Sequence, residues 1–336
     1  MIQNNKFFMD KIEKVVIFGQ SDNFPEIIKI NKKLKLETII ITSKHQSKLM
    51  DKKKTNYIIF NKIDAKFKKF IQKKTNIDKT LFVGIGPRYI FKSDTIKFFK
   101  KNFINIHNAR LPFDAGGGGY SWTIMRQDRI NNQCIHIMDE NVDGGPIIYN
   151  KLSIYPKSCV TPKDHYEFNY KKSIKFYLEF MEKLINNFKF EINKQPEYLS
   201  RYNPRLYTEQ DGLIDWNYNS YDLINFINAF DEPFKGASTY LNNGNFGKLY
   251  IKKVHLHGGD TPNHPYMSGI VSRHDKEWIV VCTASKHMLL IEEVIDKNGK
   301  NIIKKIKVGD RFFTPYSELD TPRKKRVYYN SLGKKK

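Results

Sequence analysis

Cysteine is scarce in this sequence, and its few positions are far apart. The three cysteines, Cys134, Cys159 and Cys282, are odd in number and widely spaced. A disulfide framework needs pairs, and a structural zinc site needs closely spaced ligands. The sequence therefore predicts neither disulfides nor a metal site, and a reducing cytoplasm is the expected location.

Long apolar runs are also missing. No stretch approaches the roughly 18 to 20 apolar residues that a membrane-spanning helix needs. The opening residues, MIQNNKFFMDK, contain no apolar segment of the kind that a secretion signal carries. We expect a protein without a membrane span that is not secreted.

Acidic residues are fewer than basic ones: the sequence has 35 Asp and Glu and 58 Lys and Arg, which gives a net charge of +23. The basic residues are mostly Lys and are scattered through every segment, which favours a solvated Lys-rich surface over a specific nucleic-acid partner. The alternative is a non-catalytic protein that binds nucleic acid, supported by basic clusters at 323–326 and 334–336. Against it, no recognised nucleic-acid motif is present. The sign of the charge favours an anionic substrate, and phosphate is the first anion to consider.

What the sequence has is length and apolar content: 336 residues, of which 40% are hydrophobic. This is too long for one ordinary core and predicts two domains. In the first part, short apolar runs alternate with helical patterns, which predicts a doubly wound, mostly parallel α/β sheet. Strands are expected at 13–19, 37–43, 56–60, 79–86 and 102–107, and helices at 21–35, 64–74 and 92–101. Ser21 or Asp22 would cap the first of these helices.

The second part has a different pattern. Two strands are expected around an acidic loop in 133–150, then a long helix over 163–192 and one more helix in 211–230. From 238 onward apolar strands alternate with Gly, Asn and Pro turns, which predicts a small antiparallel β-barrel or sandwich. The expected units are a catalytic domain at 1–200, a linker with a helix at 201–237, a β domain at 238–320 and a basic tail at 321–336.

Asn105 and His107 end an apolar strand and are separated by Ile106, so their side chains should face the same way. In a parallel sheet, ligands bind where strands end at their carboxyl termini. Asp143 lies further on, in DENVDGGPI. An amide, an imidazole and a carboxylate together would suit acyl transfer to an amine. The amide and imidazole can stabilise a developing oxyanion, and the carboxylate can handle the proton. No Ser or Cys stands beside His107, so direct attack by the amine is favoured over a covalent acyl-enzyme.

The stretches INIHNARLP and IHIMDENVDGGPII resemble the folate-dependent formyltransferases, in which Asn-x-His leads to a Leu-Pro turn and later an Asp-x-Gly loop. FVGIGPRYI at 82–90 and residues 211–238 extend this resemblance. It implies a Rossmann-like formyltransferase domain, 10-formyltetrahydrofolate as co-substrate and no metal. The catalytic residues it implies are Asn105, His107 and Asp143. The folate contacts it implies are Phe82, Gly84, Ile85, Gly86, Pro87, Arg88, Tyr89, Ile90, Asp139 and Val142.

One stretch departs from the family pattern: ARLPFDAGGGGYSW replaces the usual Ser-Leu-Leu-Pro and the Arg-bearing segment after it. Its glycines precede a helix expected to begin near Tyr120, and their N–H groups could hold a phosphate. The alternative is a flexible turn that lets backbone and substrate approach. Arg110 could meet a phosphate or stack on the surface. The candidate substrate contacts are Arg110, Gly116, Gly117, Gly118, Gly119 and Tyr120.

The sequence leaves several classes of molecule open as the acceptor whose amine is formylated. The tRNA enzyme of the family carries a long basic insertion after the second strand, for which 41–60 leaves no room. The purine-pathway enzyme lacks the β domain. A nucleotide-linked amino sugar is therefore the first choice, with methionyl-tRNA second and another folate-dependent formyl enzyme or hydrolase third. The sequence does not identify the sugar, its amine position or the nucleotide, and a homo-oligomer remains open.

Overall fold

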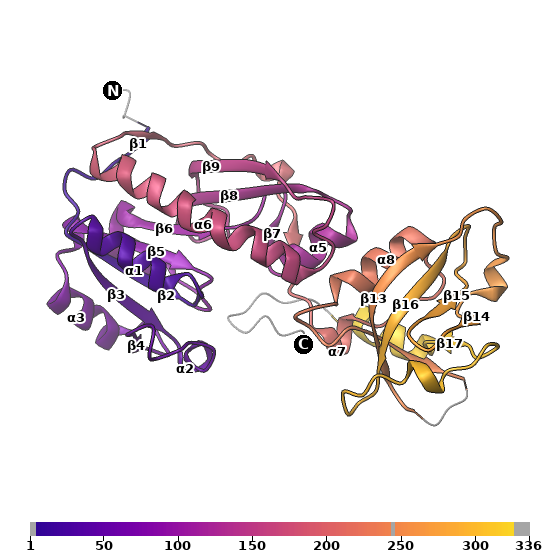
Figure 1. The fold of residues 1–336 in the computed structure, drawn as a ribbon. Coiled ribbons are helices and arrows are strands. Elements are labelled where there is room, and N and C mark those ends of the chain that lie inside the picture. Colours follow the sequence, from indigo (N-terminus) through magenta and orange to yellow (C-terminus); the bar gives the residue numbers. More distant parts are fainter. Residues whose placement is uncertain (1–4, 243–245, 326–336) are drawn as a thin grey trace.

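The computed structural model describes residues 5–242 and 246–325, which form two lobes that lie side by side (Figure 1). The N-terminal lobe is built on a seven-stranded sheet and the C-terminal lobe on a six-stranded sheet. Among the described residues, no helix has both the length and the apolar character required to cross a membrane.

The seven-stranded sheet has the order β4-β3-β2-β5-β6-β8-β9. Neighbours from β4 to β6 are parallel, whereas β6–β8 and β8–β9 are antiparallel, so the predicted mostly parallel sheet is confirmed. The strands are β2 (Lys14–Gly19), β3 (Glu37–Thr42), β4 (Ile58–Ile59), β5 (Thr80–Ile85), β6 (Phe103–His107), β8 (Ile130–Ile137) and β9 (Ile147–Ile154).

Helices cover both faces of this sheet because its central strands are apolar on both sides. Within β2, Val15 and Ile17 face the core under α1 and α6, while Val16 and Phe18 face an aromatic core under α3 and α4. The helices are α1 (Phe24–Lys33), α2 (Lys44–Ser47), α3 (Ala65–Lys74), α4 (Ser93–Phe99) and α6 (Pro162–Ile185).

Two helix boundaries differ from the expectations. Helix α1 begins at Phe24 with Asn23 as N-cap, not at Ser21 or Asp22, and Pro25 lies in its first turn. Proline suits that position because it has no N–H to satisfy and its φ is already helical. Helix α6 ends at Ile185 rather than near 192, because β10 (Phe190–Glu191) pairs with β1 (Lys6–Phe7) at the N-terminus.

The C-terminal lobe is an antiparallel half-barrel with the strand order β14-β15-β16-β13-β12-β17. Its two ends approach each other, since Val271 N–H donates to Asp310 O over 2.8 Å and Phe312 N–H donates to Gly269 O over 2.8 Å. This confirms the predicted small β domain. Its strands are β12 (Ala237–Leu241), β13 (Leu249–His257), β14 (Val271–His274), β15 (Ile279–Val281), β16 (Met288–Ile295) and β17 (Phe312–Phe313), and α8 (Ser220–Ala229) packs on them.

The predicted basic tail at 321–336 is only partly described. Its first residues belong to α9 (Tyr316–Arg323), a helix that the sequence reasoning did not place. Residues 326–336, with the basic cluster at 334–336, lie outside the described residues. The domain boundaries at 200, 237 and 320 therefore stay predictions.

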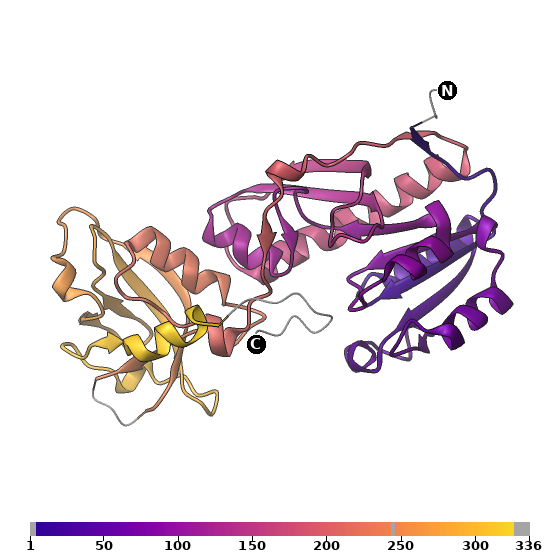
Figure 2. The same cartoon turned by 180° about the vertical axis from the view of Figure 1, so that it is seen from behind.

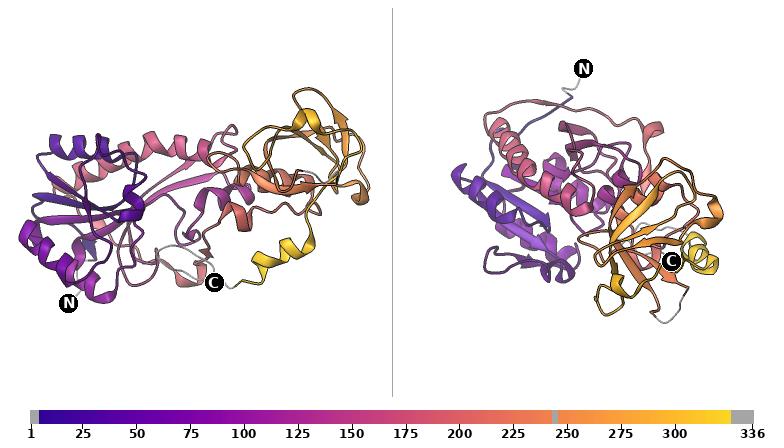
Figure 3. Two further views of the ribbon diagram at one scale, coloured as in Figure 1. Left: turned by 90° about the horizontal axis from the view of Figure 1, so that it is seen from below. Right: turned by 45° about the vertical axis from the view of Figure 1, so that its right-hand side comes forward.

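The two lobes meet at α5 (Gly119–Met125). Ile124 and Met125 of this short helix pack into the core of the C-terminal lobe. The chain that leaves α6 runs back along the N-terminal lobe before it enters the C-terminal lobe (Figures 2 and 3). On the way, β11 (Tyr202–Asn203) pairs in parallel with β7 (Ala115–Gly116), so the linker lies against the loop that leads into α5.

Candidate active site

A cavity of about 190 Å³ lies where β5 and β6 end at their carboxyl termini. We call it the central cavity. Asn105, His107 and Asp143 all line it, together with the loop after β5, the loop between β8 and β9, and one residue of the linker. Its lining residues are Gly86, Pro87, Tyr89, Ile90, Phe91, Asn105, His107, Gly116, Met138, Asp139, Glu140, Asn141, Val142, Asp143 and Arg205.

The imidazole and the carboxylate that the sequence singled out lie close together. His107 Nε2 is 3.7 Å from Asp143 Oδ2, and both side chains are half-buried or more. The two residues come from different strands and loops, and only the antiparallel pairing of β6 with β8 brings the Asp143 loop beside the end of β6. The geometry suits an ion pair that shortens when a reacting group enters, as sites without substrate commonly do.

A second histidine belongs to the same site. His136 lies opposite Asn105 in the β6–β8 register, is 1% exposed, and its Nε2 is 3.1 Å from Asn105 Nδ2. Its Nδ1 is 3.1 Å from the carbonyl of Ile137, so a proton on Nδ1 leaves Nε2 free to accept from Asn105. His136 Nε2 is also 3.8 Å from Asp143 Oδ1. The alternation of His136 with Ile135 and Ile137 predicts a structural histidine in a strand, and the β6–β8 register is what brings it to the site.

Asp143 is held in place from several sides. Its Oδ2 accepts the N–H of Gly116 over 3.0 Å, and Gln195 Nε2 donates to its carbonyl over 2.8 Å. Its backbone φ is +55°, a left-handed conformation that Asp tolerates better than most residues. Burial raises the pKa of the Asp143 carboxyl, but the charge of His107 and the contact with His136 outweigh burial, so its pKa lies below the ordinary value. The carboxylate therefore stays ionised at neutral pH.

The predicted folate contacts separate into two groups. Gly86, Pro87, Tyr89, Ile90, Asp139 and Val142 line the central cavity, so contact with a folate stays a prediction for them. Phe82, Gly84, Ile85 and Arg88 do not line it. Phe82 is a correction: its ring is fully buried against Phe99, with centroids 4.3 Å apart. A Cβ at Gly84 would stand 2.7 Å from Asn105 Oδ1, so glycine leaves room for that amide. Folate contact at Gly84, Ile85 and Arg88 stays a prediction.

The structure gives the glycine turn, Gly116–Gly119, a role that the phosphate prediction did not include. The Gly116 N–H is bonded to Asp143 and the Gly117 N–H to Asn203 O over 2.8 Å. A Cβ at Gly116 would lie 2.3 Å from Asn203 O, so glycine is required for the linker to approach. At Gly116 and Gly117 the structure shows the close backbone approach of the alternative, and substrate contact at Gly116–Gly119 stays a prediction.

Tyr120 does not line the cavity. Its ring lies 5.9 Å from that of His165, and burial raises the pKa of its hydroxyl, which hydrogen bonds to Asn169 and Asn108 lower in part. Tyr120 is half-buried, and substrate contact at this residue stays a prediction.

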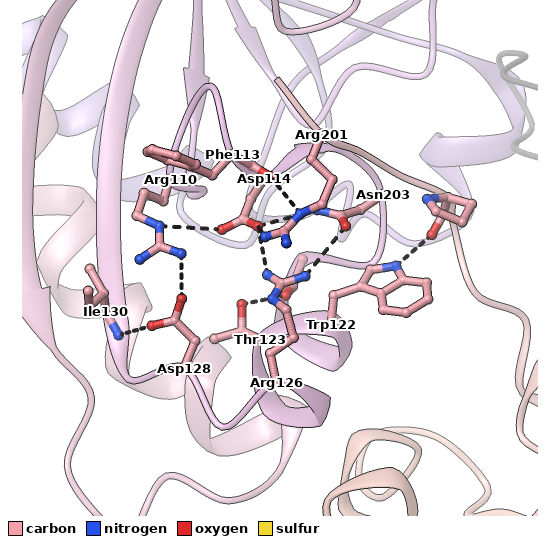
Figure 4. Close-up of polar contacts among 12 residues, drawn as sticks. Arg110, Phe113, Asp114, Trp122, Thr123, Arg126, Asp128, Ile130, Arg201 and Asn203 are labelled. Atoms are coloured by element: carbon pink, nitrogen blue, oxygen red, sulfur yellow. Dashed lines mark hydrogen bonds and ion pairs between the residues drawn. The ribbon is translucent and has the colours of Figure 1, made fainter. Parts of the chain in front are cut away.

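Arg110 is bound within the protein as part of a charged cluster (Figure 4). Its Nη2 is 2.7 Å from Asp128 Oδ2, its Nε is 3.9 Å from Asp114 Oδ2, and its guanidinium lies over the Phe113 ring. Asp114 is 8% exposed and also pairs with Arg126 over 2.6 Å and Arg201 over 3.3 Å. Two carboxylates already neutralise Arg110, so the predicted phosphate contact is not what the structure favours. We call this the Asp114 cluster; it consists of Arg110, Asp114, Arg126, Asp128, Arg201 and Asn203.

Sequence reasoning missed the lining residue Arg205, and it also missed Phe91, Met138, Glu140 and Asn141. Arg205 follows β11 in the linker and reaches the cavity because the linker pairs with β7. Nothing in the local sequence YNPRLY marks it as a site residue. Only the long-range pairing of Tyr202 with Ala115 brings it beside His107 and Asp143.

Comparison with known proteins gives a consistent family. Residues 13–162 match the model described as formyl transferase, and residues 207–306 match the model described as formyl transferase, C-terminal domain. The chain is 25% identical over 173 residues to the bifunctional polymyxin resistance protein ArnA of Wigglesworthia glossinidia brevipalpis, covering 52% of this chain and 26% of that protein. It is 27% identical over 213 residues to the methionyl-tRNA formyltransferase of Mycoplasma mycoides subsp. mycoides, covering 62% and 63% respectively.

Among solved structures, the N-formyltransferase from Helicobacter canadensis, in complex with folinic acid and dTDP-3-aminofucose, has a TM-score of 0.61 at 17% identity. That match covers 84% of this chain and 99% of the other. At this identity the likeness is one of fold. The chain spans less than two thirds of the length of the two sequence relatives named above.

Proposed function

Because the chain belongs to the formyl transferase family, as its matches at 13–162 and 207–306 show, we propose that it formylates the amine of a nucleotide-linked amino sugar. The formyl donor in this proposal is 10-formyltetrahydrofolate. The observation that carries the proposal is the convergence of Asn105, His107 and Asp143 on the central cavity. The cytoplasmic location and the absence of a metal stay predictions.

The central cavity fits a folate in two respects. Pro87, Ile90, Met138 and Val142 give it an apolar wall, which suits a flat pterin ring. Asn105 Oδ1 is buried and has no hydrogen-bond partner among the described residues, so the site offers an acceptor to a donor on a bound ligand. When bound, the folate would supply the electrophilic formyl carbon.

Asn105, His107 and Asp143 have different roles in the proposed formyl transfer, which follow from their charges. The Asn105 amide donates one N–H to His136 and keeps a second for the formyl oxygen, where negative charge develops. His107 can place a second donor there when it is protonated. Asp143 places its negative charge 3.7 Å from His107 Nε2 and can receive the proton that the attacking amine loses.

Direct attack by the amine is the consistent route, because no Ser or Cys lines the described cavity. Cys134, opposite His107 in the β6–β8 pair, is fully buried, and burial raises the pKa of its thiol to about 12. A thiol in that state is protonated at neutral pH and is a poor nucleophile.

Two findings support the amino-sugar acceptor. The solved N-formyltransferase with dTDP-3-aminofucose is matched in fold over 99% of its length. The region after β3 holds only the four-residue helix α2 before the chain reaches β4, which leaves little room for an inserted element that would guide tRNA.

Methionyl-tRNA is the second candidate. It is favoured by the names of several sequence relatives and by the net charge of +23. The amino-sugar proposal requires that tRNA bind only through this charge, and counterion release makes such binding fall steeply with salt.

The test is to incubate the protein with 10-formyltetrahydrofolate and a panel of nucleotide-linked amino sugars, and to follow the gain of one formyl group by mass. We expect one or a few members of the panel to be formylated. A panel without any product, with methionyl-tRNA formylated at physiological salt, would replace the proposal with the second candidate.

A further inference from the structure

One arginine lines the central cavity and a second lies in the loop beside it, and neither forms an ion pair among the described residues. Arg205 lines the cavity from the linker side. Arg88 lies in the loop after β5, between the lining residues Pro87 and Tyr89. Among the ion pairs of the described residues, none involves Arg88 or Arg205, whereas Arg110, Arg126 and Arg201 all pair with Asp114.

Arg88 is held by neutral groups. Its N–H donates to Gln46 Oε1 over 3.3 Å, and its Nη1 is 3.2 Å from His45 Nδ1. Gln46 is 1% exposed and also donates to Gly86 O over 2.9 Å, so α2 fixes the backbone of this loop. The charge of Arg88 is therefore positioned but not neutralised.

Arg205 is positioned by the glycine turn. A Cβ at Gly117 would lie 3.1 Å from Arg205 Cβ and 3.2 Å from its Cα, so the missing side chain lets Arg205 approach closely. No hydrogen bond or ion pair of the Arg205 side chain is present among the described residues. Arg205 is half-buried and lines the central cavity, so its guanidinium is available to a ligand.

The two charges are close enough to affect each other. Burial lowers the pKa of Arg88, and the positive charge of Arg205 lowers it further. Two half-buried like charges without a counterion are unfavourable, and an anion that meets both relieves their repulsion.

We propose that Arg88 and Arg205 form the subsite for the diphosphate of the acceptor, a role that the sequence had suggested for Arg110 and the glycine turn. This inference rests on the proposed function for the identity of the acceptor. Guanidinium groups bind phosphate oxygens in a planar, bidentate fashion. The diphosphate of a nucleotide-linked sugar is attached to the sugar ring, so a diphosphate held at Arg205 leaves that ring near His107. A carboxylate of the folate could offer the same charge, and the experiment below separates the two sources.

The experiment measures binding by calorimetry to Arg88→Gln, Arg205→Gln and the wild type, with inorganic pyrophosphate, UDP, dTDP and 5-formyltetrahydrofolate as probes. Each substitution should weaken binding of the diphosphate probes about tenfold to a hundredfold, because each removes charge-assisted hydrogen bonds. Binding of 5-formyltetrahydrofolate should change less than about twofold. Arg205→Lys should give an intermediate loss, since it keeps the charge and loses the fork.

Arg273→Gln is the matched control, because Arg273 is exposed in the C-terminal lobe over the Trp278 ring. It should leave all four probes unaffected. Should Arg205→Gln not fold, Arg88→Gln and Arg205→Lys carry the same prediction. Folate binding that weakens while diphosphate binding does not, or diphosphate binding that is equal in all variants, would overturn the subsite.

The outcome is separable from that of the proposed function. A wild type that formylates no amino sugar but loses diphosphate binding in both variants would retain the subsite and reject the acceptor. A wild type that formylates a nucleotide-linked sugar with the same KM as the variants would retain the acceptor and reject the subsite.

Discussion

Arginines lie on both sides of the loop that carries the glycine turn, and they differ in their ion pairing. On one side, the Asp114 cluster joins three arginines to two carboxylates, and its charges are largely satisfied (Figure 4). On the other side, Arg205 lines the central cavity and forms no ion pair among the described residues, although Asp143 lines the same cavity. This difference indicates that ion pairing with carboxylates decides whether an arginine guanidinium stabilises the fold or remains available to a ligand.

We therefore expect the Asp114 cluster to stabilise the fold and the residues of the central cavity to carry the reaction. The cluster fixes the linker to the loop, since Arg201 and Asn203 both contact Asp114. These contacts fix the position of the linker, and Arg205 of that linker lines the central cavity. Substitutions on the two sides should separate accordingly.

The largest effect is expected for His107→Ala on the cavity side. It removes a donor to the developing oxyanion and the group that exchanges a proton with Asp143, so the rate should fall at least about 100- to 1,000-fold. The free energy of unfolding should change little, because His107 lines a cavity rather than a packed core. Turnover of the purified variant, with thermal unfolding alongside, measures both.

The control is His274→Ala, which removes an exposed histidine of β14 in the other lobe. It should be indistinguishable from the wild type. Comparable turnover of His107→Ala and His274→Ala would exclude His107 from the mechanism.

Asp143→Asn should lower the rate about 100-fold, within the usual range for losing a proton-handling group. It also carries a pH signature. The pKa of Asp143 is depressed in the folded state, so its stabilising contribution is present above the unfolded pKa, about 3.9, and is lost as pH falls through the folded pKa. The difference in unfolding free energy between wild type and variant should therefore be constant above about pH 5 and shrink in acid.

Asp139→Asn is the matched comparison, because Asp139 lines the same cavity and burial raises the pKa of its carboxyl. This variant should not lose stability in the same way at neutral pH. Urea unfolding across pH 2.5 to 7 tests the pair, and parallel curves for wild type and Asp143→Asn at every pH would show that Asp143 is only a turn residue.

On the cluster side, Asp114→Asn should mainly lower stability. Asp114 is 8% exposed and meets three guanidinium groups, so its loss should cost about 1 to 3 kcal/mol of unfolding free energy. Asp128→Asn, which removes a partner of Arg110 only, should cost less. Chemical denaturation gives the ranking, and a large loss of turnover without loss of stability would reverse the assignment of the two sides.

The smallest effect is expected at the glycine turn itself. Gly117→Ala should displace Arg205 by a few tenths of an ångström, since the new Cβ meets its Cα and Cβ at 3.1 to 3.2 Å. We expect KM for the acceptor to rise about threefold to tenfold with little change in kcat. A KM equal to that of the wild type would contradict the account of how Arg205 is positioned.

Much of this picture could be predicted from the sequence. The alternation of apolar runs with helical patterns gave the α/β sheet, and the spacing of Asn105 and His107 around Ile106 placed both at one strand end. These are local patterns, and Asp143 joined them through a resemblance to a family. Their catalytic roles stay proposals.

The rest depends on contacts between distant segments. His136 could be linked to Asn105 only through the β6–β8 register, and Arg205 only through the β7–β11 pairing. Phe82 lies in a strand that leads to the cavity, but its side chain turns into the aromatic core. Arg110 looked available because its shorter ion pair is with Asp128, well beyond it in the chain, although its second partner, Asp114, is a near neighbour.

The most direct test of the central claim is a competition assay at physiological salt. The protein receives 10-formyltetrahydrofolate, a nucleotide-linked amino sugar that was active in the panel and methionyl-tRNA, with His107→Ala in parallel. The account predicts that the formyl group appears by mass on the sugar amine in the wild type alone and not on the tRNA. Formyl-methionyl-tRNA as the main product, or sugar formylation that persists in His107→Ala, would contradict it.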